Sequence, residues 1–105
     1  MTIKPLRLIL TDEAKADLRG MRKHIAKESP KAAKAFTKEL TTKLKKLADT
    51  GVTGSSRDWV SSGLRGFPYK DRCFYFRIVE RKMIVVRVLH SKLDISAQEF
   101  SDTSE

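Results

Sequence analysis

The sequence predicts an α+β fold: an N-terminal strand, an antiparallel helical hairpin, and then an antiparallel sheet of three to four strands packed on the hairpin. Two observations predict it. Two apolar stripes with helical spacing follow one another between residues 14 and 47, separated by a short break. Two segments with the alternation typical of strands, residues 72–79 and 83–90, follow a loop rich in Gly, Ser and Thr.

The first strand is predicted at residues 3–10, where Leu6, Leu8 and Leu10 share one face of the alternating pattern. Pro5 has no N–H to donate. We therefore expect an edge strand, or a strand that begins after the proline.

The helical hairpin has clear start and stop signals. Thr11 is suited to cap the first helix, which is expected to end near Glu28. Ser29-Pro30 places an N-cap before a proline at the first helical position, and Gly51 is expected to close the second helix. The residues predicted to face the sheet are Ala14, Leu18, Met21 and Ile25, then Ala33, Phe36, Leu40, Leu44 and Leu47.

Residues 50–63 are predicted to form a loop that Trp59 and Val60 anchor to the core. A short strand is expected at residues 64–67, stopped by Pro68. A three-residue turn at residues 80–82 is then expected to pair Val79 with Met83.

That register divides the two main strands into two faces. The face expected to receive the hairpin is wholly apolar and holds Phe74, Phe76, Ile78, Ile84, Val86 and Val88. The other face places Tyr75 opposite Arg87 and also holds Cys73, Arg77, Val79, Met83, Val85 and Leu89. This second face is too apolar for a surface that contacts only solvent and too charged for a core. It is therefore predicted to bind a partner.

Length and composition limit the classes of function. The 105 residues suit one domain, which we place at residues 1–95, followed by an acidic tail at residues 96–105. No apolar run is long enough to cross a membrane, and no signal peptide is recognisable. The single Cys excludes an intrachain disulfide and suits a reducing compartment, so we expect a cytoplasmic protein. Two His argue against a closed Cys/His zinc site, and we expect no metal or other cofactor.

The net charge of +9 predicts an anionic partner, either nucleic acid or an acidic protein segment. A lysine-rich solvated surface would explain the same charge. Arg65, Arg77 and Arg87 are the residues suited to clamp a phosphate or carboxylate, with Asp94 as a candidate internal counter-ion. His90 titrates near neutral pH and is a candidate proton-transfer group, although a histidine at a strand end more often has a structural role.

The chain resembles the ParE/RelE superfamily of bacterial toxins from type II toxin–antitoxin modules. The resemblance covers residues 3–95 and is carried by the stretches LTDEAKADLRGMRKHIAKESPKAAKAF and GLRGFPYKDRCFYFRIVERKMIVVRVLHSKLD. The positions that match the family pattern are Ala14, Asp17-Leu18, Ala33, Phe36, Leu64-Arg65, Arg87-Val88-Leu89-His90, Lys92 and Asp94.

The ending Val88-Leu89-His90 resembles the ParE branch. This implies a toxin that inhibits DNA gyrase, serves plasmid stabilisation, and is held in a hetero-oligomer by an acidic ParD-like antitoxin. Nucleic acid would then be met only within the target complex. The candidates for antitoxin or target contact are Arg65, Tyr75, Arg77, Arg87, His90 and Lys92.

The alternative is a RelE-like, ribosome-dependent mRNA endoribonuclease that needs no metal and uses His90 for proton transfer. The RelE branch carries a lysine pair before the Leu-Arg step, whereas residues 57–64 of this chain contain no Lys. That departure favours a binding toxin without a catalytic residue.

Overall fold

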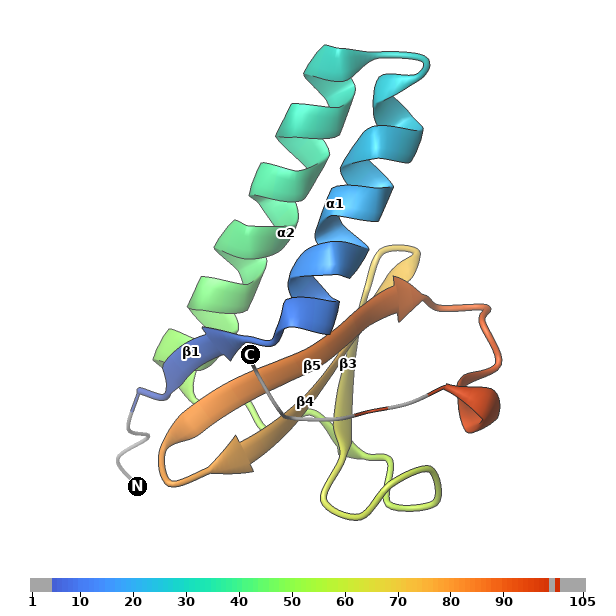
Figure 1. Ribbon diagram of the computed structural model, residues 1–105. Coiled ribbons are helices and arrows are strands. Elements are labelled where there is room, and N and C mark those ends of the chain that lie inside the picture. Colours follow the sequence, from blue (N-terminus) through green and yellow to red (C-terminus); the bar gives the residue numbers. More distant parts are fainter. Residues whose placement is uncertain (1–4, 99, 101–105) are drawn as a thin grey trace.

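The computed structural model describes residues 5–98 and 100 and confirms the α+β fold (Figure 1). Five strands form one sheet in the order β1-β5-β4-β3-β2, and two long helices stand on one face of it. The elements are β1 (Arg7–Leu10), α1 (Asp12–Ala26), α2 (Pro30–Thr50), β2 (Ser55–Ser56), β3 (Arg65–Tyr69), β4 (Arg72–Val79), β5 (Lys82–His90) and a 3₁₀ turn, η1 (Ile95–Ala97).

The N-terminal strand makes the sheet mixed rather than antiparallel. β1 begins after Pro5, as one of the two expectations had it, and pairs in parallel with β5 from Arg7↔Lys82 to Leu10↔Val85. Residues 3 and 4 of the predicted strand lie outside the described part. Parallel strands need a long connection between them, and the two helices that follow β1 form part of such a connection to β5.

Both helix starts are confirmed. The Thr11 hydroxyl accepts a hydrogen bond from the Ala14 N–H and donates one to the Val86 carbonyl, so this cap also ties α1 to β5. The Ser29 hydroxyl accepts from the Ala32 N–H, and Gly51 closes α2 with φ of 68°. α1 ends at Ala26, two residues before the predicted end.

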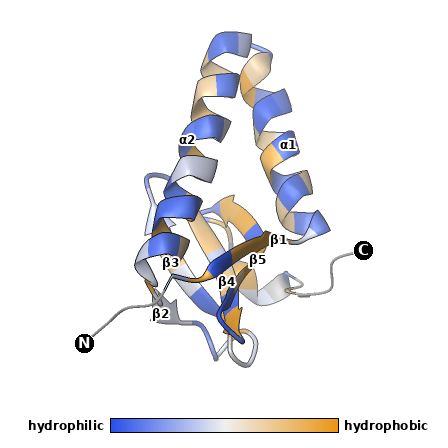
Figure 2. Ribbon diagram, turned by 90° about the vertical axis from the view of Figure 1, so that its left-hand side faces the viewer, coloured by the Kyte–Doolittle hydropathy of each residue, from blue (hydrophilic) through white to orange (hydrophobic). Residues whose placement is uncertain are grey.

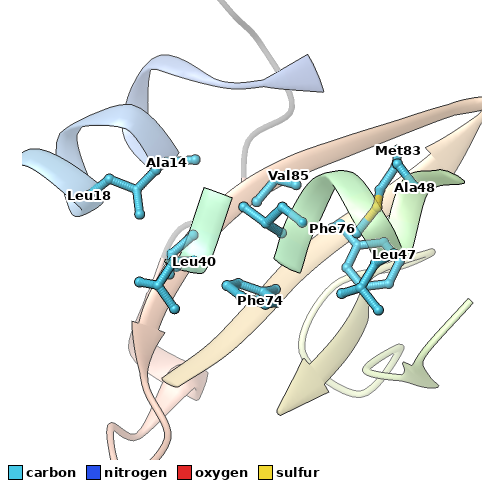
Figure 3. Packing of buried hydrophobic residues seen from close by; sticks show 11 residues of the cluster. Ala14, Leu18, Leu40, Leu47, Ala48, Phe74, Phe76, Met83 and Val85 are labelled. Carbon is cyan, nitrogen blue, oxygen red and sulfur yellow. The ribbon is translucent and has the colours of Figure 1, made fainter. Parts of the chain in front are cut away.

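The main core lies between the helices and the sheet (Figure 3). The predicted helical stripes are confirmed at most positions: Ala14, Leu18, Leu40, Leu44 and Leu47 are buried there, with Met21 and Phe36 partly buried at its edge. Ala33 is buried and Ile25 is half-buried, but both lie outside this cluster. The strands contribute Phe74, Phe76, Met83, Val85 and Val88. Figure 2 shows the same arrangement as hydrophobic colour on the strands and alternating colours along the two helices.

The predicted faces of β5 are partly wrong. Met83 and Val85 lie in the helix-side core, whereas Ile84 and Val86 lie on the opposite side. The turn has two residues, Glu80 and Arg81, both with positive φ, and it pairs Val79 with Lys82 rather than with Met83.

A β-bulge then restores the predicted register. Phe76 pairs with Val85 but Tyr75 pairs with Arg87, so Val86 is an extra residue in β5. The bulge adds the residue that the shorter turn had removed. As a result, the predicted pairing of Tyr75 with Arg87 is confirmed although the predicted turn is wrong.

Two expectations for the segment before β4 are also wrong. The predicted loop contains β2, and Pro68 lies within β3 opposite Cys73. β2 pairs only with Arg65 and Gly66, so the outer edge of β3 is free at Pro68 and the missing N–H leaves no partner unpaired. Gly54 is required where β2 begins, because a Cβ there would lie 2.5 Å from the Gly66 carbonyl oxygen.

Candidate functional site

The second face of the sheet is covered by the protein itself. Leu64, Cys73, Tyr75, Val86 and Leu89 form a second buried cluster with Ile95 and Phe100. We call the covering residues 95–98 and Phe100 the C-terminal strap. Its Phe100 ring meets the Tyr75 ring edge-on at 5.2 Å between centroids. Burial raises the pKa of Tyr75 to about 12. The folded part therefore continues beyond residue 95, and Tyr75 presents little surface to a partner.

Arg77 holds this cover in place. Its guanidinium donates to the Phe100 carbonyl at 2.7 Å, to the Ser62 carbonyl at 3.2 Å, and to the Ser61 hydroxyl. It thus joins the C-terminal strap to the loop before β3. The structure places Arg77 in a structural network rather than at an open anion clamp.

Arg87 forms a two-point ion pair with α1. Its Nε and Nη2 donate to the two carboxylate oxygens of Asp17 at 2.8 and 2.9 Å. The Val88 N–H also donates to Asp17, at 3.0 Å. The side chains of Arg87 and Asp17 are only 20% and 14% exposed, and the hydrogen bond that Arg87 donates to Asp17 raises the pKa of Arg87.

The expected counter-ion was therefore the wrong residue. Asp94 caps the 3₁₀ turn, accepting from the Ser96 N–H at 3.0 Å and the Ser96 hydroxyl at 2.8 Å. Asp17 neutralises Arg87 instead, and Arg77 is bonded elsewhere. The predicted pair of arginines around a shared anion is not assembled.

Arg65 braces the turn before β2, donating to the carbonyls of Thr53 and Gly54. His90 and Lys92 are exposed at the end of β5. The His90 Nδ1 accepts the Lys92 N–H at 3.1 Å, and its Nε2 lies 3.8 Å from the Asp71 carboxylate. Of the six candidates, only His90 and Lys92 are exposed.

A basic groove, which the sequence did not indicate, runs between α2 and the end of β3. It has a volume of about 530 Å³ and is lined by Ala35, Lys38, Glu39, Thr42, Lys43, Lys46 and Tyr69. Lys43 Nζ lies 5.4 Å from the Tyr69 ring centroid and 5.7 Å from that of Phe67. The helix pattern alone gave these lysines no common partner. The groove appears only when β3 is laid beside α2.

The single acid in this groove is fixed. Glu39 accepts a hydrogen bond from the Tyr69 hydroxyl at 2.6 Å and pairs with Lys70 Nζ at 2.5 Å. The bond from Lys70 lowers the pKa of Glu39, and the bond to Glu39 raises the pKa of Tyr69. Glu39 is thereby neutralised by Lys70, and Lys38, Lys43 and Lys46 leave the groove positive.

Trp59 does not anchor its loop, contrary to the prediction. Its side chain is 70% exposed, whereas the neighbouring Val60 packs against the second buried cluster. Sequence alone could not decide which of two adjacent apolar residues points inward.

Among the residues that the structure describes, no group of three His, Cys, Asp or Glu side chains is placed to hold a metal ion. Within the same residues, no helix is long and apolar enough to span a membrane.

Comparison with known proteins identifies the family. Among curated proteins, no sequence matches this chain. One similar solved structure is a chain described as the chromosomal ParDE TA system from P. aeruginosa. It has 20% identity and a TM-score of 0.69, and the match covers 83% of this chain and 97% of that chain. This likeness supports the fold. The family described as the ParE toxin of the type II toxin–antitoxin system parDE matches residues 8–95, and the chain belongs to that family.

Proposed function

We propose that this chain is a toxin that inhibits DNA gyrase by binding, without hydrolysing a substrate. The observation that carries the proposal is the dispersal of the basic candidates. Arg65 braces a turn, Arg77 holds the C-terminal strap, and Arg87 is paired with Asp17. A metal-independent nuclease needs several cations and a proton-transfer group around one phosphate.

The alternative, a ribosome-dependent mRNA endoribonuclease, is favoured by one observation. His90 is exposed and lies 3.8 Å from the Asp71 carboxylate, a pairing that could orient an imidazole for proton transfer. Lys92 is its cationic neighbour in sequence, but Asp71 is also bound by Arg72 at 3.1 Å. The Asp71 carboxylate is therefore shared between His90 and Arg72.

The two functions separate by substitution. His90→Gln keeps hydrogen-bonding capacity and removes the titrating group, and His24→Gln, at an exposed position of α1, is the matched control. A nuclease that relies on His90 should lose on the order of 10²–10⁴ in rate. We expect purified protein to inhibit gyrase supercoiling, His90→Gln to retain most of this potency, and neither variant to cut mRNA on ribosomes. Cleavage that His90→Gln abolishes would establish the alternative.

We further propose an acidic ParD-like antitoxin as the neutralising partner, in the bacterial cytoplasm where gyrase acts. The groove of Lys38, Lys43 and Lys46, with the Tyr69 ring in its wall, suits an acidic segment. His90 and Lys92 offer a second exposed contact. Arg65, Tyr75, Arg77 and Arg87 would influence binding through the segments that they hold.

Charge reversal tests the groove. Lys38→Glu/Lys43→Glu/Lys46→Glu should slow association with the antitoxin and flatten its salt dependence. Lys31→Glu/Lys34→Glu/Lys45→Glu makes the same charge change at exposed positions of the same helix, outside the groove. Equal losses in the two triple variants would show that net charge alone matters and that the groove is no site.

A further inference from the structure

Trp59 is an exposed indole on a well-fixed loop. We call residues 57–63 the Trp59 loop. The indole is 70% exposed, while the other large exposed apolar side chains of the described residues, Val79 and Leu93, are 42% and 43% exposed. Tryptophan is the residue type with the largest apolar area to offer a partner, and it is enriched at interface hot spots.

The backbone on both sides of Trp59 is held by hydrogen bonds. The Asp58 carboxylate accepts from the Gly63 N–H and from the Ser56 hydroxyl, each at 2.8 Å. The bond from Ser56 lowers the pKa of Asp58, so this acceptor stays charged at neutral pH. The base of the loop is closed by Arg57 N–H to the Leu64 carbonyl at 2.7 Å. The loop therefore needs little further ordering to bind.

The far side of the loop is fixed to the sheet. Val60 packs on the second buried cluster, and Arg77 binds Ser61 and Ser62. These contacts of the described residues all involve other residues of the loop, and none of them uses the Trp59 indole. The side chain is presented outward on a rigid support.

Charge identifies the kind of partner. Three arginines lie at or near the loop. Arg57 is part of it, Arg77 binds it, and Arg65 binds the turn before β2. Asp58 is the one acid of the loop. This surface fits an apolar pocket with an acidic rim. A second copy of the chain is disfavoured, because each copy carries a net charge of +9.

We propose that Trp59 is the apolar anchor by which the toxin binds its protein target, an acidic-rimmed pocket on DNA gyrase. The inference rests on the proposed function. The Trp59 loop precedes the first residue of β3, whereas the basic groove includes Tyr69, the last residue of that strand. Target and antitoxin contacts are thereby assigned to opposite ends of β3.

The test uses the full chain and purified bacterial gyrase. Trp59→Ala should raise the concentration needed to inhibit supercoiling by about 30-fold or more, the loss typical of a hot-spot residue. Trp59→Phe should recover part of the potency, and Leu93→Ala, at another exposed apolar position, should retain all of it. Hydroxyl-radical footprinting should show that bound gyrase protects Trp59 from oxidation and leaves Leu93 unprotected. Thermal unfolding of each variant verifies the fold.

The possible failures are distinguishable. If the wild-type protein leaves gyrase active, the proposed function is wrong. Gyrase is then also wrong as the partner of the Trp59 surface. Inhibition that Trp59→Ala leaves unchanged overturns the anchor alone. Protection of Trp59 by single-stranded DNA without gyrase would assign the indole to base stacking and overturn a protein pocket.

Discussion

On one side of the sheet, two capped helices cover the buried residues; on the other, the Trp59 loop and the C-terminal strap cover them. The helix-side core includes Phe74, Phe76 and Leu44, which have no exposed surface. The second cluster ends in Ile95 and Phe100 at its rim, and Arg77 ties its two covering segments together. The helical side is expected to provide global stability, and the other side is expected to open locally.

Removal of a central ring should have the largest effect. Phe76→Ala should lower the free energy of unfolding by about 3–5 kcal/mol, because it leaves a cavity in the helix-side core. Denaturant unfolding of the variant measures the loss. If the variant unfolds like the wild type, Phe76 is not central to the core and the comparison of the two sides fails.

The ion pair between α1 and β5 should matter next. Asp17→Ala leaves Arg87 and the Val88 N–H without their acceptor. Because solvent reaches both side chains, we expect a loss of about 2 kcal/mol, below the range for fully buried pairs. The double variant Asp17→Ala/Arg87→Met should recover part of it in the same assay. A double variant less stable than Asp17→Ala would contradict this reading.

A loss of similar size is expected on the strap side. Phe100→Ala should cost about 1.5–3 kcal/mol, at the lower end if the strap relaxes. Hydrogen exchange should rise in residues 95–98 and in the Trp59 loop while α1 and α2 keep their protection. Uniform acceleration across the chain would show that the two sides unfold as one unit.

The pKa of Tyr75 depends on the same C-terminal strap, which buries its ring. Its pKa is raised above the unfolded value of about 10, so the burial of neutral Tyr75 contributes stability below pH 10. That contribution is lost as pH rises through about 12. Phe100→Ala should lower this pKa, because burial is its main cause. Because Tyr69 also titrates, the phenolate absorbance would be followed against pH in Tyr69→Phe and in Tyr69→Phe/Phe100→Ala. Coinciding curves would contradict the account.

The least effect on stability is expected at Trp59. Because the indole is exposed, Trp59→Ala should change the free energy of unfolding by no more than about 0.5 kcal/mol. Val60→Ala, at the adjacent position that packs inward, should cost more. Calorimetry of the two variants would show which substitution lowers stability more. The reverse order would restore the sequence-based expectation that Trp59 anchors the loop.

Local signals predicted the helical side well. Thr11, Ser29-Pro30 and Gly51 mark helix ends through bonds made within a few residues. The apolar stripes follow from helical spacing, which does not depend on the rest of the chain. These features can be read in a sequence because their causes are local.

The other side depends on contacts that are distant in sequence. Arg77 looked like a binding residue because the residues that it bonds, Ser61 and Phe100, lie far from it along the chain. Asp17 and Arg87 are likewise brought together only by the docking of α1 on β5. The bulge at Val86 compensates a turn that the residues alone left uncertain.

The most direct test of a gyrase-binding toxin is the order of events after its induction in bacteria. Plasmid supercoiling, DNA breaks and the rate of protein synthesis would be followed in the same culture. The account predicts that supercoiling changes and breaks appear before translation slows. Translation that stops first, with cut mRNA and unchanged supercoiling, would contradict it.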